Sequence, residues 1–211
     1  MERILQNFLD ESIGAFRSYK KLAEKAMKQV SDEEFFKAID EEANSIATIT
    51  KHIGGNLRSR WTDFLLTDGE KSDRNRDAEF MTDGDTRESL MNFWEAGWKT
   101  LFETLQSLTI EDLDKTVQIR GEDFMVVKAV NRAAMHTASH IGQIQFLAKY
   151  FRSTDWQTLS VPKNKSAEYN SYLAGKEDKG NYLEVTQEFA EKLGKEKWAG
   201  GESRFPHKHF T

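Results

Sequence analysis

The chain has 211 residues, five histidines, no cysteine and a formal net charge of −5 at pH 7. This length suits one main domain with room for an extension. The acidic balance argues against nucleic acid as the main partner, because a phosphate-binding face shows as an excess of basic residues. The absence of cysteine excludes disulfides, thiolate metal ligands and a cysteine nucleophile.

The same features predict a cytoplasmic protein that does not enter a membrane. No apolar run approaches the roughly 20 residues of a membrane-spanning helix. The first residues, Met1 to Ile4, lack the pattern of a signal peptide. Only two prolines occur, and both lie beyond residue 160, which leaves the preceding chain free to form long helices.

Four long stretches show the three- and four-residue spacing of apolar residues that is typical of amphipathic helices. They cover residues 2–29, 43–61, 85–108 and 126–151. Ser31, followed by Glu34, predicts a capping box that opens a new element after the first helix. Asp85 with Glu88 gives a similar signal at the start of the third helix.

The connections between these helices differ in character. Residues 62–85 are dense in charged side chains, with turn signals at 68–69 and 83–84, and they predict a long solvated crossover. Val117 and Ile119 alternate with polar residues, which predicts a short extended piece before the last helix.

The composition changes after Arg152, where Lys, Gly, Asn and Ser become frequent. Two short groups of apolar residues beyond it predict one or two short helices. We therefore expect a domain of residues 1–152 and a C-terminal extension, residues 153–211, that packs on it. The fold class that we predict is all-α: a four-helix bundle with a long crossover loop and this extension.

The last predicted helix contains His136 and His140, which share one face at the edge of its apolar stripe. Two imidazoles four residues apart suit neighbouring positions around a metal ion, although ordinary core histidines show the same pattern. His52 faces near the core from the second helix and is followed closely by Gly54-Gly55. Two glycines are costly inside a helix, so they indicate a kink, a frayed helix end, or the close approach of another backbone or a ligand.

Three imidazoles make up a catalytic type of metal site, which keeps an open position for water or substrate. The predicted ligands are His52, His136 and His140, and Zn, Ni, Cu and Fe all accept imidazole. Arg132 lies one turn before His136, where its charge favours neutral histidine and could bind a cofactor or substrate anion. A surface ion pair is the alternative role for Arg132. We interpret Gln143 as an ordinary polar residue rather than a partner that orients a ligand.

Two parts of the sequence resemble the DinB/YfiT-like superfamily of proposed metalloenzymes. They are Asn44-Ser45-Ile46 ahead of His52, and the run from His136 through His140 to Gln143. Residues 55–64 and 68–71 resemble one of its uncharacterised subfamilies, and the likeness spans about residues 1–152. The resemblance implies an up-down-down-up four-helix bundle, often a homodimer, with a divalent metal on the three histidines.

The resemblance also suggests kinds of reaction. Related families include transferases and isomerases that use low-molecular-weight thiols such as bacillithiol or mycothiol, and others are described as hydrolases. We therefore expect a metal-dependent enzyme for a small-molecule substrate, with thiol transfer as the first hypothesis. Hydrolysis is the second, although no carboxylate stands out as its general base. The third is a non-catalytic, stress-related dimer whose metal has no open coordination position, because a further ligand such as His207 or His209 fills it.

Overall fold

The computed structural model describes residues 2–177 and 181–199, and they are mostly helical, as an all-α fold requires. The chain divides into two compact units, Met1–Trp156 and Gln157–Thr211. Within the described ranges, no helix is both long enough and apolar enough to cross a membrane.

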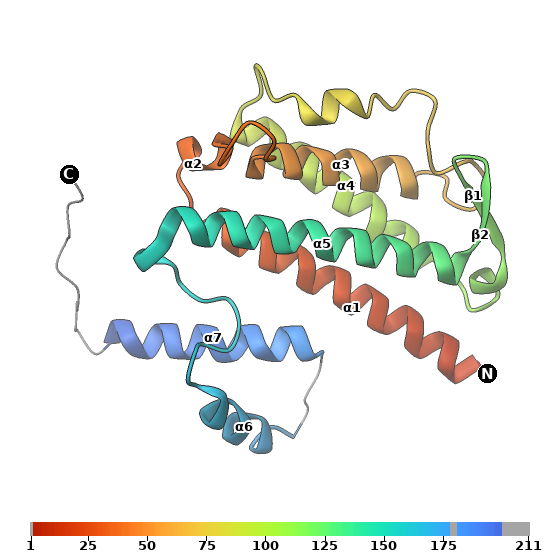
Figure 1. The fold of residues 1–211 in the computed structure, drawn as a ribbon. Coiled ribbons are helices and arrows are strands. Elements are labelled where there is room, and N and C mark those ends of the chain that lie inside the picture. Colours follow the sequence, from red (N-terminus) through yellow and green to blue (C-terminus); the bar gives the residue numbers. More distant parts are fainter. Residues whose placement is uncertain (1, 178–180, 200–211) are drawn as a thin grey trace. The chain divides into compact units, whose positions relative to one another are not determined.

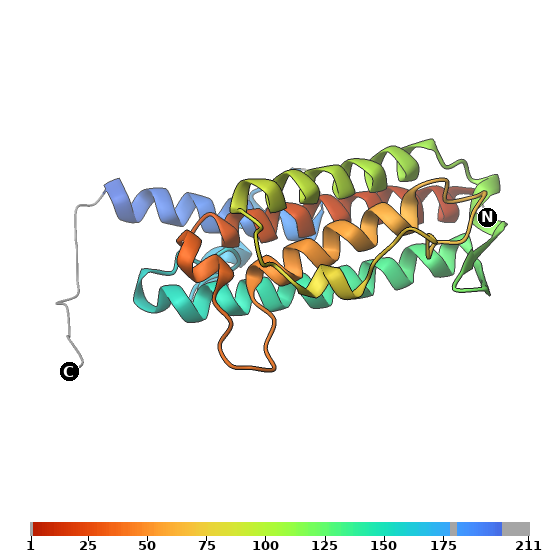
Figure 2. The ribbon, with the colours of Figure 1, turned by 90° about the horizontal axis from the view of Figure 1, so that it is seen from above.

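Four long helices make up most of the first unit. They are α1 (Glu2–Met27), α3 (Ile46–Trp61), α4 (Arg87–Ser107) and α5 (Val126–Arg152). Figures 1 and 2 show them running alongside one another, with α3 packed on α4 and α1 packed on α5. Three 3-10 turns complete the connections: η1 (Asp77–Phe80), η2 (Glu111–Asp114) and η3 (Ser153–Asp155).

Side-chain caps fix where several helices begin. The predicted capping box at Ser31 is present and opens the short helix α2 (Asp32–Phe36). The predicted cap of α4 was wrong by one residue, because Thr86 accepts the hydrogen bond from the backbone N–H of Ser89. Asp85 instead pairs with Lys51 at 2.7 Å, so its carboxylate joins the crossover to α3.

A β-hairpin leads into α5. The predicted extended piece is β1 (Thr116–Ile119), and it pairs antiparallel with β2 (Glu122–Met125), which the sequence did not reveal. Arg120 and Gly121 form the turn with φ of 58° and 74°, the conformation that two-residue hairpin loops prefer. The carboxylate of Asp68 accepts hydrogen bonds from both of their backbone N–H groups, at 2.8 and 2.7 Å. The crossover is thereby attached to the hairpin.

The glycines after His52 allow close approach rather than a kink, because α3 continues through them. A Cβ on Gly97 of α4 would lie 2.6 Å from the backbone oxygen of Gly54, so these two helices meet backbone to backbone. A Cβ on Gly55 would collide with the carboxylate of Glu79, which the crossover brings against α3. Both contacts require the absence of a side chain.

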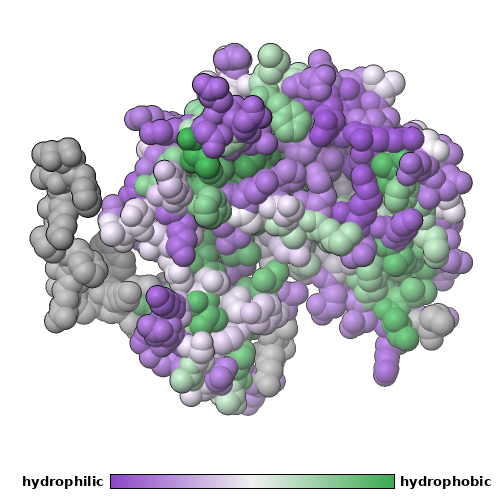
Figure 3. All heavy atoms as spheres, viewed as in Figure 1, coloured by the Kyte–Doolittle hydropathy of each residue, from purple (hydrophilic) through white to green (hydrophobic). Residues whose placement is uncertain are grey.

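The core of the first unit is rich in aromatic rings. Phe16 of α1 lies edge-on to Trp61 of α3 and Trp98 of α4, each at a centroid distance of 6.4 Å. Trp94 and Trp98 have no exposed surface, so they are core residues. Hydrophilic side chains predominate along the upper part of the face in Figure 3, where the crossover runs in Figure 1.

The described residues of the second unit form two helices, α6 (Ser166–Ala174) and α7 (Tyr182–Ala199). One or two helices were predicted after Arg152, but α7, with 18 residues, is not the short helix that we expected. Tyr169 of α6 packs with Val185 and Phe189 of α7 in a small core of its own. The tail histidines, His207 and His209, lie outside the described residues.

Candidate metal centre

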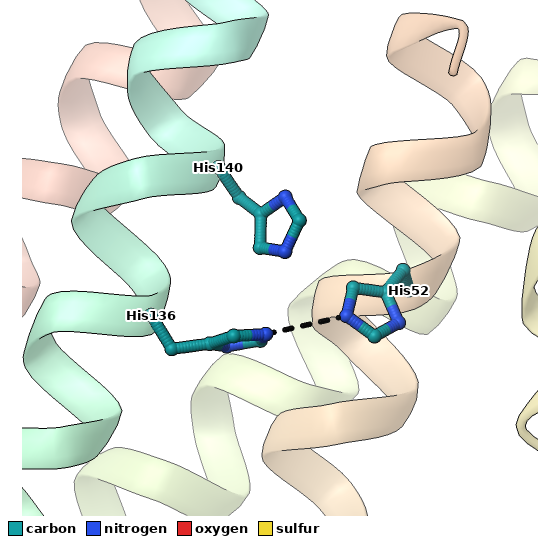
Figure 4. Close-up of side chains that lie close together, drawn as sticks. All are labelled: His52, His136 and His140. Carbon is teal, nitrogen blue, oxygen red and sulfur yellow. Dashed lines mark hydrogen bonds between the residues drawn. The ribbon is translucent and has the colours of Figure 1, made fainter. Parts of the chain in front are cut away.

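Three imidazoles converge between two helices. His136 and His140 project from α5 toward His52 on α3, as Figure 4 shows. The Nε2 atoms of His52 and His136 are 3.3 Å apart, and one ring nitrogen of each histidine lies within 4.8 Å of the other two. Two nitrogens bound at about 2.0–2.1 Å to a tetrahedral zinc ion would be roughly 3.3–3.4 Å apart. The donor set and its spacing therefore fit a divalent metal.

The surroundings of these rings favour the neutral form that binds a metal. Burial lowers the pKa of His136 to about 3, and the charges of His140, His52 and Arg132 add to the effect. Burial also lowers the pKa of His140, although the hydrogen bond with Gln143 acts in the opposite direction. Neither imidazole has to lose a proton at neutral pH before its nitrogen lone pair is available.

His52 is oriented by a buried carboxylate. Its Nδ1 lies 2.9 Å from Oε2 of Glu79, and each residue is about 5% exposed. Because a carboxylate only accepts, the proton of His52 lies on Nδ1, and the Nε2 lone pair faces the other two imidazoles. The geometry is that of a metal-binding histidine held by an outer carboxylate.

Glu79 is itself held by Arg74. The Nε and Nη2 atoms of this arginine donate to the two carboxylate oxygens at 2.7 and 2.8 Å. Burial by itself raises the pKa of Glu79, but the hydrogen bonds from His52 and Arg74 and the charge of Arg74 outweigh it and keep this pKa below its usual value. The carboxylate is therefore ionised and fixed in place.

Neither Glu79 nor Arg74 was identified from the sequence. Both lie in the crossover, where we predicted a solvated loop, and for these two buried side chains that prediction was wrong. The one signal was Gly54-Gly55, which indicated a close approach without identifying the partner. Glu79 sits on η1, and Gly55 leaves the room that its carboxylate occupies.

Gln143 has a more specific place than we expected. Its Oε1 lies 2.7 Å from Nδ1 of His140, so the amide oxygen accepts the ring proton. The interpretation of Gln143 as an ordinary polar residue was therefore wrong, since it orients this imidazole as Glu79 orients that of His52. The i, i+3 spacing on one helix was the available signal.

Arg132 lies on the exposed side of α5. Its guanidinium stacks over the ring of Phe124 at 5.8 Å, and it lines the same pocket as His52 and His136. In the part of the chain that the structure describes, Arg132 forms no ion pair, so the surface ion pair that we considered for it is not seen there.

Fold and site together define an all-α protein with three histidines that could hold a metal ion. The chain belongs to the family described as "Protein of unknown function (DUF1572)", whose family model matches residues 3–165. No curated protein matches it. The matched range includes all three histidines and the crossover with Glu79 and Arg74.

Proposed function

We propose that this protein is a metal-dependent enzyme of the DinB-like superfamily. A divalent transition metal such as Zn, Ni or Fe would bind His52, His136 and His140 and keep a further position for substrate. The observation that supports this most directly is the convergence of three imidazoles, two of which, His52 and His140, have their Nδ1 atoms engaged by Glu79 and Gln143. The four long helices would form the up-down-down-up bundle that the resemblance implies.

A metal at this position would supply Lewis acidity and favour the thiolate form of a bound thiol at neutral pH. The chain's own residues do the positioning. Glu79 keeps the proton of His52 on Nδ1, and Gln143 does the same for His140. Arg132, exposed beside His136, would attract an anionic group of a cofactor or substrate.

Thiol transfer is the reaction that this arrangement supports best. Hydrolysis needs a free general base for water, but both oxygens of Glu79 are already engaged by His52 and Arg74. A thiolate needs no such base. Its sulfur would form a bond to an electrophilic carbon, the leaving group would depart with its electron pair, and solvent would take up the thiol proton.

Metal content tests the first part of the proposal. The protein, purified without chelators or a histidine tag, should contain close to one metal ion per chain. The His136→Ala variant should lose it, whereas a variant with His207→Ala and His209→Ala should keep it. A metal-free wild-type protein that also binds none of the added metals would overturn the proposed site. Loss of metal in the tail variant would favour the closed, non-catalytic alternative.

Thiol consumption tests the second part. Metal-loaded protein is incubated with bacillithiol or mycothiol and a panel of electrophiles, and free thiol is followed by a colorimetric reagent. Metal-dependent consumption that His136→Ala abolishes is the expected result. Loaded protein that consumes no thiol would remove this reaction. We further propose that the protein is a homodimer, which light scattering during size-exclusion chromatography would test.

A further inference from the structure

A pocket of about 190 Å³ lies beside the three histidines in the first unit, and His52 and His136 line it. Trp61, Phe64 and Ile119 give it an apolar wall. Five arginines also line it: Arg60, Arg74, Arg76, Arg120 and Arg132. The volume is several times the roughly 30 Å³ that one water occupies in the liquid, so the pocket has room for a small charged group.

Positive charge exceeds negative charge around this pocket. Glu70 pairs with Arg60 at 2.9 Å, Arg74 at 3.2 Å and Arg120 at 3.3 Å. Glu79 is shared between Arg74 and His52. Asp68 accepts backbone hydrogen bonds from the hairpin turn. The nearby positive charge of Arg60 also helps to lower the pKa of Asp68. Among the described residues around the pocket, five guanidinium groups against these three carboxylates leave an excess of two positive charges.

Arg60 is the least satisfied of these arginines. It is 6% exposed, and its Nη2 binds Glu70. Its Nε and Nη1 atoms are buried without a hydrogen-bond partner among the described residues. Burial lowers the pKa of Arg60 to about 10, so the side chain stays protonated at neutral pH. A buried cationic donor without an acceptor is unfavourable, and an anion in the pocket that Arg60 lines would offset part of that cost through its negative charge.

We propose that this pocket binds a small molecule through a compact oxyanion group with two negative charges, either a phosphate or a pair of carboxylates. Arg60 would bind it from the buried side, and the exposed Arg76 and Arg132 from the solvent side. Guanidinium groups suit such oxyanions because they donate two parallel hydrogen bonds. That this molecule is the enzyme's substrate rests on the proposed function, whereas the anion site itself does not.

Calorimetric titration of the full-length, metal-free protein tests the inference. The probes are inorganic phosphate and malonate at pH 8, with acetate as the singly charged comparison, all at constant ionic strength. Phosphate or malonate should bind saturably, and at least about tenfold more tightly than acetate. Arg60→Gln and Arg132→Gln should each weaken that binding by about tenfold. Arg58→Gln, at an exposed position of the same helix, should leave it unchanged.

Several outcomes would overturn the inference. They are the absence of saturable binding for both dianions, affinity equal to that for acetate, and wild-type affinity in Arg60→Gln and Arg132→Gln. Arg60 is buried, so circular dichroism must show that its variant folds; Arg132 is exposed, and its variant decides the matter if the first does not fold. Anion binding without metal binding would refute the proposed metal-dependent enzyme but not the anion site. Metal binding without anion binding would refute only the anion site.

Discussion

The hydrogen bond between Glu79 and His52 allows a quantitative prediction about metal affinity. Glu79→Gln keeps the shape of the side chain and an oxygen that can accept from Nδ1 of His52, but it removes the negative charge. Outer partners of metal-binding histidines typically contribute 10- to 100-fold to affinity, which corresponds to about 1.4–2.7 kcal/mol. We expect Glu79→Gln to weaken metal binding by about tenfold and Glu79→Ala by about 100-fold.

Glu79→Gln should also destabilise the metal-free protein. It leaves the charge of Arg74 without its bidentate partner, and this side chain is only 5% exposed. Removing one member of a buried ion pair costs about 3–5 kcal/mol. Because Glu70 still contacts Arg74 at 3.2 Å, we expect the lower end, about 3 kcal/mol.

Two measurements separate these effects. Competition with a chromophoric chelator gives the metal affinity, and urea denaturation of the metal-free protein gives the free energy of unfolding. Glu103→Gln on the exposed face of α4 is the matched control, since the ion pair of Glu103 with Lys99, at 3.8 Å, lies at the surface. If folded Glu79→Gln protein binds metal as tightly as the wild type, the charge of Glu79 does not contribute to metal affinity and the reasoning fails.

Three further predictions follow from other contacts. Gln143→Leu should weaken metal binding less than Glu79→Ala, because His140 can donate to water instead; chelator competition would show this. Gly97→Ala should lower the free energy of unfolding by about 1–3 kcal/mol or more, whereas Gly142→Ala, with open space around it, should raise it by up to about 1 kcal/mol; equal effects in urea denaturation would contradict the tight helix contact. Hydrogen bonds from the backbone of Glu70, Gly121 and Arg120 lower the pKa of Asp68. The ionised Asp68 carboxylate therefore stabilises the fold above its ordinary pKa of 3.8. This stabilisation is lost as the pH falls through the lower pKa that Asp68 has in the folded protein. Asp68→Asn should be less stable at neutral pH and lose less stability on acidification, and parallel acid unfolding of the two proteins would refute this.

Much of the helical structure could be predicted because it depends on local chemistry. The apolar spacing located all four long helices to within three residues at each end. The capping box at Ser31 is a contact within four residues, so the sequence contains all of it. His136 and His140 share a helix face for the same reason. The cap of α4 was misplaced because Thr86 and Asp85 are both good caps, and the pairing of Asp85 with Lys51 depends on a distant helix.

By itself, the sequence determined the helices and the face on which each histidine lies, since periodicity reports which side of a helix is buried. It could not determine what a loop brings to that side. Only the tertiary structure placed Glu79 against His52, 27 residues away in the chain, and left two nitrogens of Arg60 without a partner among the described residues. Charged loop residues are solvated by default, and they become part of a site only when packing removes water from around them.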